Sequence, residues 1–159
     1  MDKRDHINIG IITPRAYEFD GFNEDSSQRI NYRNILEYLG KYYSENFQIK
    51  LLTQLNSGGG IDTITVASKN KWPLDVYLSC NNSVFNIAHW SEKFNENTDN
   101  FDTIKYFKGK YLSKKYIETN KQIVGESDVV IYVMNSLKYK CSILNFAFST
   151  NKPLYLLRV

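Results

Sequence analysis

Long apolar runs and proline-rich stretches are both missing from this sequence. Only three of the 159 residues are proline, and no window approaches the roughly 18 apolar residues that a membrane-spanning helix needs. The amino terminus, MDKRDHINIGII, passes from charged residues directly into a short strand-like run, without the apolar region of a signal peptide. We therefore expect a cytoplasmic protein.

Cysteine is scarce as well. Cys80 and Cys141 lie far apart in the sequence, with no Cys-x-x-Cys pair and no neighbouring pair of histidines. Zinc sites and disulfide frameworks need closer or more regular spacing. We expect both thiols to be small core or pocket-lining side chains, and we expect no metal.

An excess of charge of one sign is also missing. The formal net charge is +3, and acidic residues are interspersed with basic ones. Proteins that follow a nucleic-acid backbone carry a stripe of lysine and arginine. The composition therefore argues against nucleic acid as a partner, whereas small anionic molecules stay compatible with it.

Aromatic residues, in contrast, are plentiful. The chain has 12 tyrosines and 9 phenylalanines, more than a domain of this size easily buries. Aromatic side chains left on the surface tend to mark interfaces. We expect a homo-oligomer, with a dimer as the simplest form.

The order of apolar segments predicts one α/β domain over residues 1–159. Strand-like runs alternate with segments of helical spacing, an order that implies parallel pairing with right-handed crossovers. We expect strands near 7–12, 49–52, 74–78, 128–134 and 153–159, and helices near 30–43, 62–70, 113–126 and 142–149. Residues 81–110 are expected to form a long loop or lid. The predicted fold class is a Rossmann-like open, mainly parallel sheet with helices on both faces.

A glycine loop, Ser57-Gly58-Gly59-Gly60, stands between the second strand and a helix that begins with Asp62-Thr63. Glycine lets a backbone approach a ligand closely, and a helix amino terminus offers unpaired N–H groups to an anion. The alternative is a tight turn without a ligand. The spacing matches neither the dinucleotide fingerprint G-x-G-x-x-G nor the P-loop, which disfavours NAD binding and ATP hydrolysis.

Several segments together resemble the SLOG superfamily of Rossmann-like proteins, which includes the LOG phosphoribohydrolases, the DNA-processing protein A family and small nucleotide-sensing domains. They are GIITPR, KLLTQLNSGGGIDTITVAS, ETNKQIV, SDVVIYVM and NKPLYLLRV. The resemblance implies ligand contacts from Thr13, Pro14 and Arg15 after the first strand. It implies further contacts from Gly60-Ile61-Asp62 and from Asn120.

This chain departs from the enzymes of that group. The LOG motif P-G-G-x-G-T-x-x-E is replaced by a segment, 135–142, with neither the glycines nor a carboxylate. Nucleoside 2-deoxyribosyltransferases, a second comparison, use a nucleophilic Glu where this chain has Ile143. We therefore expect no catalytic residue at these positions.

Each candidate residue has a structural alternative. Arg15 could bind phosphate or form an ion pair with Glu18 or Asp20. Asp62 could accept a bond from a ribose hydroxyl or cap its helix, and Thr63 could donate to phosphate. Trp90 could stack on a ligand or complete the core. The full set expected to line the ligand site is Thr13, Pro14, Arg15, Ser57, Gly58, Gly59, Gly60, Asp62, Thr63, Trp90, Asn120, Met134, Asn135 and Ser136.

Three functions follow from this pattern. The first is binding of a nucleotide or ADP-ribose-like molecule through the glycine loop, as a sensor or sponge in bacterial antiviral or phage signalling. The second is cleavage of an N-glycosidic bond in a nucleoside monophosphate, with Glu18, Asp62 or Glu118 recruited as the acid. The third is single-stranded DNA binding in recombination, suggested by the match of Gly-Ile-Asp-Thr to DNA-processing protein A. No cofactor is expected beyond the nucleotide-derived ligand.

Overall fold

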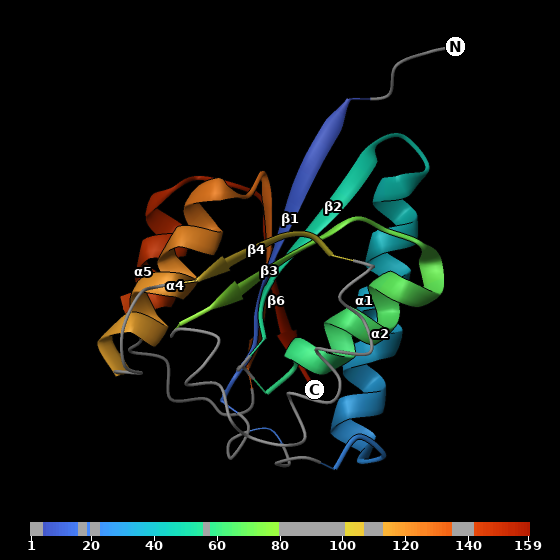
Figure 1. The fold of residues 1–159 in the computed structure, drawn as a ribbon, viewed down its shortest axis with the longest axis horizontal. Helices are drawn as coiled ribbons and strands as arrows, with labels where there is room; N and C mark the ends of the chain where they lie inside the picture. Colours follow the sequence, from blue (N-terminus) through green and yellow to red (C-terminus); the bar gives the residue numbers. More distant parts are fainter. Residues whose placement is uncertain are drawn as a thin grey trace.

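The computed structural model describes residues 5–15, 19, 23–55, 58–79, 101–106, 113–134 and 142–159. Six strands form one sheet in the order β4-β3-β2-β1-β5-β6, and every neighbouring pair is parallel (Figure 1). The strands are β1 (His6–Ile12), β2 (Gln48–Gln54), β3 (Leu74–Leu78), β4 (Phe101–Tyr106), β5 (Val129–Met134) and β6 (Leu154–Arg158). The helices are α1 (Ser27–Ser44), α2 (Gly60–Asn70), α4 (Ser113–Glu126) and α5 (Ser142–Ser149).

The sheet has helices on both faces, as the sequence predicted. Helices α1 and α2 lie on one face, and α4 and α5 lie on the other (Figure 1). This arrangement is a Rossmann-like open α/β fold. Among the described residues, no helix is both long and apolar enough to cross a bilayer.

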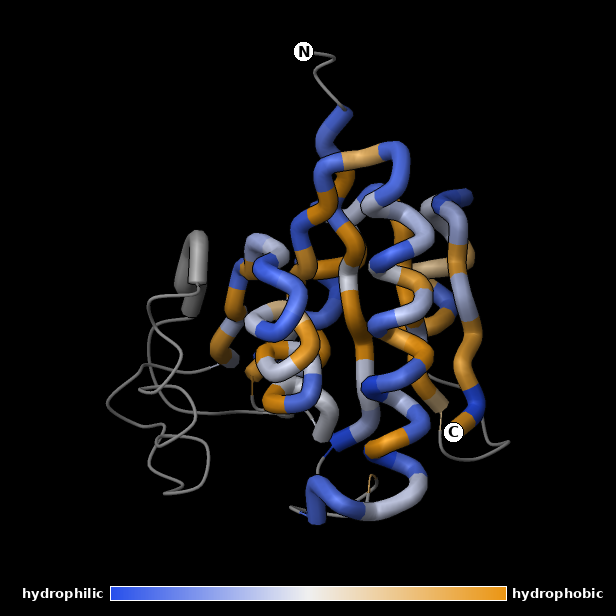
Figure 2. The backbone as a smooth tube through the Cα atoms, turned by 90° about the vertical axis from the view of Figure 1, so that its right-hand side faces the viewer, coloured by the Kyte–Doolittle hydropathy of each residue, from blue (hydrophilic) through white to orange (hydrophobic). Residues whose placement is uncertain are grey.

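Two apolar cores sandwich the sheet. All five residues of β3 are buried, as are the first five of β5, which explains their nearly continuous apolar sequences. Figure 2 shows apolar stretches along the strands, while the helices alternate between apolar and polar turns. The positions predicted to be buried in the sheet are all buried: Ile9, Ile11, Leu51, Val76, Val129, Ile131 and Val133.

The start of one helix and the presence of one strand differ most from the sequence prediction. Helix α1 begins at Ser27, earlier than expected, because the hydroxyl of Ser26 accepts a hydrogen bond from the Arg29 N–H and caps the helix. Strand β4 lies inside the region 81–110 that was expected to be a loop, and it pairs with β3 at the sheet edge. Residues 80–100 and 107–112 lie outside the described part of the chain.

The strand order reverses direction next to β1. Strands β2, β3 and β4 follow one another outward on one side of β1, whereas β5 and β6 extend the sheet on the other side. In open parallel sheets, the crevice at the carboxyl ends of the strands on either side of such a reversal is the usual ligand site. Thr13, Pro14 and Arg15 follow β1 directly at this point.

Candidate functional site

The segment after β1 is joined to the glycine loop after β2 by two hydrogen bonds. The Gly59 N–H donates to Oγ1 of Thr13 at 2.9 Å, and the Gly58 N–H donates to the carbonyl oxygen of Pro14 at 2.7 Å. Thr13 is buried, so its hydroxyl is held inside the protein. The structure therefore brings together residues that the sequence placed in one site, but it uses two of the loop donors within the chain.

Close packing explains why the loop is made of glycine. A Cβ on Gly58 would lie 2.6 Å from the Pro14 carbonyl oxygen, and one on Gly60 would lie 2.6 Å from that of Gln54. A Cβ on Gly59 would lie 2.6 Å from Cγ2 of Thr13 and 2.9 Å from Cε1 of Tyr32. Gly59 has a φ of −99°, so no left-handed backbone is needed there. The glycines let the loop pack against the ends of β1 and β2, a reason that differs from the predicted cradle of free N–H groups.

Asp62 binds two arginines of α1. Its Oδ2 accepts from Nε of Arg29, and its Oδ1 accepts from Nη1 of Arg33 at 2.6 Å. The side chains of Asp62 and Arg29 are each only 2% exposed. The N-cap of α2 is Gly59, which has no side chain, and Asp62 lies within the first turn, so Asp62 does not occupy the predicted capping position. Burial raises the pKa of the Asp62 carboxyl, and the two guanidinium groups oppose that rise.

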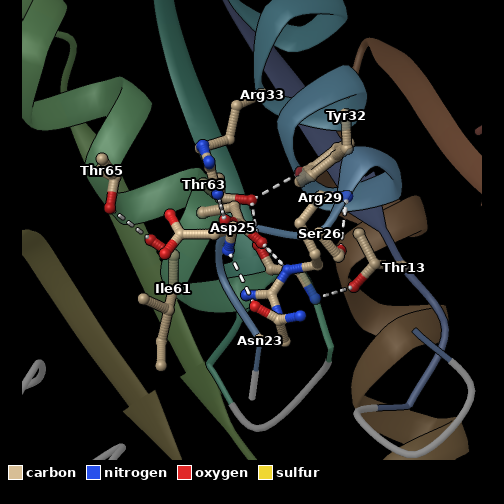
Figure 3. Close-up of polar contacts among 12 residues, drawn as sticks. Thr13, Asn23, Asp25, Ser26, Arg29, Tyr32, Arg33, Ile61, Thr63 and Thr65 are labelled. Carbon is tan, nitrogen blue, oxygen red and sulfur yellow. Dashed lines mark hydrogen bonds and ion pairs between the residues drawn. The ribbon is translucent and has the colours of Figure 1, made fainter. Parts of the chain in front are cut away.

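Thr63 is also occupied within the protein. Its Oγ1 lies 2.7 Å from the hydroxyl of Tyr32 and donates to the carbonyl oxygen of Gly59 at 2.9 Å (Figure 3). Burial raises the pKa of the Tyr32 phenol well above its ordinary value. The contact with Tyr32 joins α2 to α1, and donation from Thr63 to a phosphate stays a prediction.

Sequence reasoning missed this buried polar cluster. Its signal is a pair of arginines four residues apart, Arg29 and Arg33, on a helix whose neighbouring positions Tyr32 and Leu36 are buried. Residues four apart share one face of a helix, so both arginines can reach the same carboxylate on α2.

A second polar group lies between the sheet and α4. The guanidinium carbon of Arg15 sits 4.7 Å from the ring centroid of Tyr116, and the Tyr116 hydroxyl donates to the Thr13 carbonyl oxygen at 3.4 Å. Nε2 of Gln54 donates to Oδ1 of Asn120 at 2.8 Å. Asn120 is therefore close to the predicted site, yet it is only 2% exposed.

The remaining predicted residues divide into two groups. Met134 ends β5 and is half-buried, opposite Arg158 in the register with β6. Ser57, Trp90, Asn135 and Ser136 lie outside the described residues, as do Glu18, Asp20, Cys80 and Cys141.

Basic residues lie at the described carboxyl edge of the sheet. Arg15 is accompanied by Lys114 and Lys115 in the first turn of α4. Glu118 is 46% exposed and pairs with Lys114 at 3.7 Å, while Asp62 is occupied by its two arginines. In the described part of the chain, no three His, Cys, Asp or Glu residues come together in a way that could hold a metal ion.

A hollow of about 410 Å³ lies at the opposite, amino-terminal edge of the sheet. His6, Phe47, Lys50 and Trp72 are among its lining residues. None of the residues predicted to bind a ligand lines it.

The fold and site define an open, parallel α/β domain with a basic carboxyl edge. No protein-family profile matches the chain, and no curated protein matches it significantly. Among solved structures, it is similar to DNA processing protein A from Helicobacter pylori, whose structure was reported with its single-stranded DNA binding mode. The TM-score is 0.64 at 16% identity, and the match covers 94% of this chain but 64% of that protein. The similarity shows a shared fold.

Proposed function

We propose that this chain binds single-stranded DNA along the carboxyl edge of its sheet. The observation that carries the proposal is the fold shared over 94% of the chain with a DNA processing protein described as binding single-stranded DNA. The proposal departs from our expectation from composition that nucleic acid is not a partner. The proposal treats residues 1–159 as one domain that acts in the cytoplasm.

Arg15 is the residue best placed to contact the strand. Its guanidinium lies over the Tyr116 ring, which fixes the orientation of the cation. A planar, oriented guanidinium can bind a phosphate or stack on an unpaired base. Tyr116 is buried, so its role is to position Arg15.

Local charge supports the proposal more than net charge does. The net charge of +3 is small for a nucleic-acid-binding protein. Arg15, Lys114 and Lys115 nevertheless gather at one edge, beside the first turn of α4. A short contact with a few phosphates needs only such a cluster, and its affinity falls as salt rises.

Fluorescence anisotropy with a labelled oligothymidine tests the proposal. We expect binding that weakens steeply between 50 and 200 mM salt. Arg15→Gln should weaken it by about tenfold, the loss of one charged contact. Lys41→Gln is the matched control, because it removes the same charge from the exposed end of α1 near the amino-terminal edge. Absence of binding at low salt, or equal binding by both variants, would contradict the proposal.

A nucleotide or ADP-ribose-like small molecule is the second candidate. It is supported by the reversal of strand order next to β1, since open sheets bind nucleotides at that point. The first turn of α2 also has N–H groups without intrahelical acceptors. Such a ligand would fit a sensor or sponge in antiviral signalling. Calorimetry with NAD, ADP-ribose and cyclic nucleotides distinguishes it: heat of binding from a small molecule, with no anisotropy change from DNA, favours this second candidate.

Glycosidic cleavage is not proposed. Two of the three recruited acids named from the sequence are engaged elsewhere, Asp62 with Arg29 and Arg33, and Glu118 with Lys114. The third, Glu18, lies outside the described residues.

A further inference from the structure

Strand β6 ends the sheet with an apolar sequence that no other strand of the described residues covers. Its residues, Leu-Tyr-Leu-Leu-Arg, are half-buried or exposed, unlike the buried strands β3 and β5. Within the described residues, β6 pairs only with β5. Its outer edge therefore presents main-chain N–H and C=O groups that another strand could pair with.

Exposed apolar side chains lie on β6 itself and on the two helices next to it. The large exposed apolar residues of the described chain all lie on α1, α5 and β6: Ile30, Tyr38, Tyr42, Phe148 and Leu156. Helix α1 lies beside β6, since the Tyr43 and Tyr155 hydroxyls are 2.9 Å apart (Figure 2). On the other face, Leu154 packs against the core that contains Ile143 and Leu144 of α5.

Soluble proteins normally protect an exposed strand edge with charge, proline or a bulge. The middle of β6 carries none of these, and its first charge is Arg158 at the end. The nearby cation Lys152 donates to the Val124 and Gly125 carbonyl oxygens of α4 instead. An edge without such protection indicates a partner strand.

We propose that a second copy of this chain pairs with β6 in antiparallel orientation about a two-fold axis through Leu156. The strand Leu154–Arg158 is centred on Leu156, so this register pairs its whole length with itself. Tyr155 then faces Leu157 of the second copy, and Leu154 faces Arg158. No two like charges meet, so the strand is compatible with its own copy.

Exposed aromatic side chains would add to the area that this pairing buries. A two-fold axis perpendicular to the sheet places α1 beside the α1 of the second copy, and α5 beside its α5. Tyr38 is 71% exposed, and Tyr42 and Phe148 are each 56% exposed. Aromatic side chains bury on the order of 150–250 Å² each. Together with the strand, these three approach the ~800 Å² per partner of a standard interface.

Light scattering after gel filtration tests the pairing. At about 20 µM the wild-type chain should have the mass of a dimer, and Leu156→Lys should be a monomer with unchanged circular dichroism, because two lysines would meet at the axis. Thr65→Lys is the control and should stay dimeric, because Thr65 is exposed on α2, which packs against α1 and β2. A wild-type monomer at this concentration, or a dimer that Leu156→Lys leaves intact, would overturn the proposal.

Cross-linking tests the register. In a background with Cys80 and Cys141 changed to serine, Leu156→Cys should form an intermolecular disulfide under mild oxidation, because residues directly opposite in an antiparallel pair have Cα atoms ~4.5–5.5 Å apart. Ile30→Cys should cross-link at most weakly. Equal cross-linking of the two variants would overturn the pairing through Leu156.

Discussion

Arg29 on α1 and Asp62 on α2 form an ion pair with each side chain only 2% exposed. The two helices are otherwise linked near the same level by the hydroxyls of Tyr32 and Thr63. The pair therefore fixes the amino terminus of α2, and with it the glycine loop, against α1.

Removing one member of this pair should destabilise the protein strongly. Arg29→Met leaves the buried Asp62 carboxylate with Arg33 alone, and we expect a loss of about 3 kcal/mol in the free energy of unfolding. Arg33→Met should cost about 1 kcal/mol or less, because the Arg33 side chain is 23% exposed. Urea unfolding measures both, and equal losses would refute the dominant role of Arg29.

Replacing Gly59 and Gly125 with alanine should change the stability of the protein in opposite directions. Gly59→Ala pushes a Cβ against Thr13 and Tyr32, and we expect a loss of about 1–3 kcal/mol of stability. Gly125 lies in α4, and a Cβ added there would meet no neighbouring residue within 4 Å. We expect Gly125→Ala to gain about 0.5–1 kcal/mol of stability. Thermal unfolding of the two variants should move the midpoint down and up, respectively. A stabilised Gly59→Ala would show that the loop has more room than the packing indicates.

Buried tyrosines should make the protein sensitive to alkali. Burial raises the pKa values of Tyr32 and Tyr77 above the ordinary value of 10.0, so the unfolded chain releases these protons first. Their contribution to stability is complete below pH 10 and is lost as the pH rises further, by up to ~1.4 kcal/mol per pH unit for each tyrosine. Chemical unfolding between pH 9 and 11 should show a flatter decline in Tyr32→Phe than in wild type.

Lys152 should stabilise the carboxyl end of α4. Its Nζ donates to the carbonyl oxygens of Val124 and Gly125 at 2.8 and 2.9 Å, where a helix end carries partial negative charge. Lys152→Met should cost about 1 kcal/mol of unfolding free energy. Lys114→Gln, in the first turn of the same helix, should change it by only a few tenths. An equal loss of unfolding free energy in both variants would contradict a specific effect of Lys152 at the carboxyl end of α4.

The strands and helices were predictable because a strand buried on both faces has a nearly continuous apolar sequence. The apolar run 129–133 in β5 is an example, and β3 was predicted with its observed bounds. Strand β4, FDTIKY, was missed because an edge strand needs fewer apolar residues, and its polar sequence looks like a loop.

The sequence predicted that the segments after β1 and β2 lie together, but not which atoms they contact. Thr13, Gly58, Gly59 and Gly60 do come together, because neighbouring parallel strands end at one edge. The hydrogen bonds of Asp62 and Thr63 could not be predicted from the sequence, because their partners lie on α1, some 30 residues earlier in the chain. A polar residue near a glycine loop has the same sequence signal whether its partner is a ligand or another helix.

The hydrogen bonds from Gly58 and Gly59 join the glycine loop to the segment after β1. Because Pro14 precedes Arg15 directly, we expect a ligand that displaces Arg15 to weaken the hydrogen bond from the Gly58 N–H to the Pro14 carbonyl oxygen. The amide protons of Gly58 and Gly59 should therefore be sensitive to ligand binding at Arg15. Their rate of exchange with solvent would register occupancy of the carboxyl edge from within the protein.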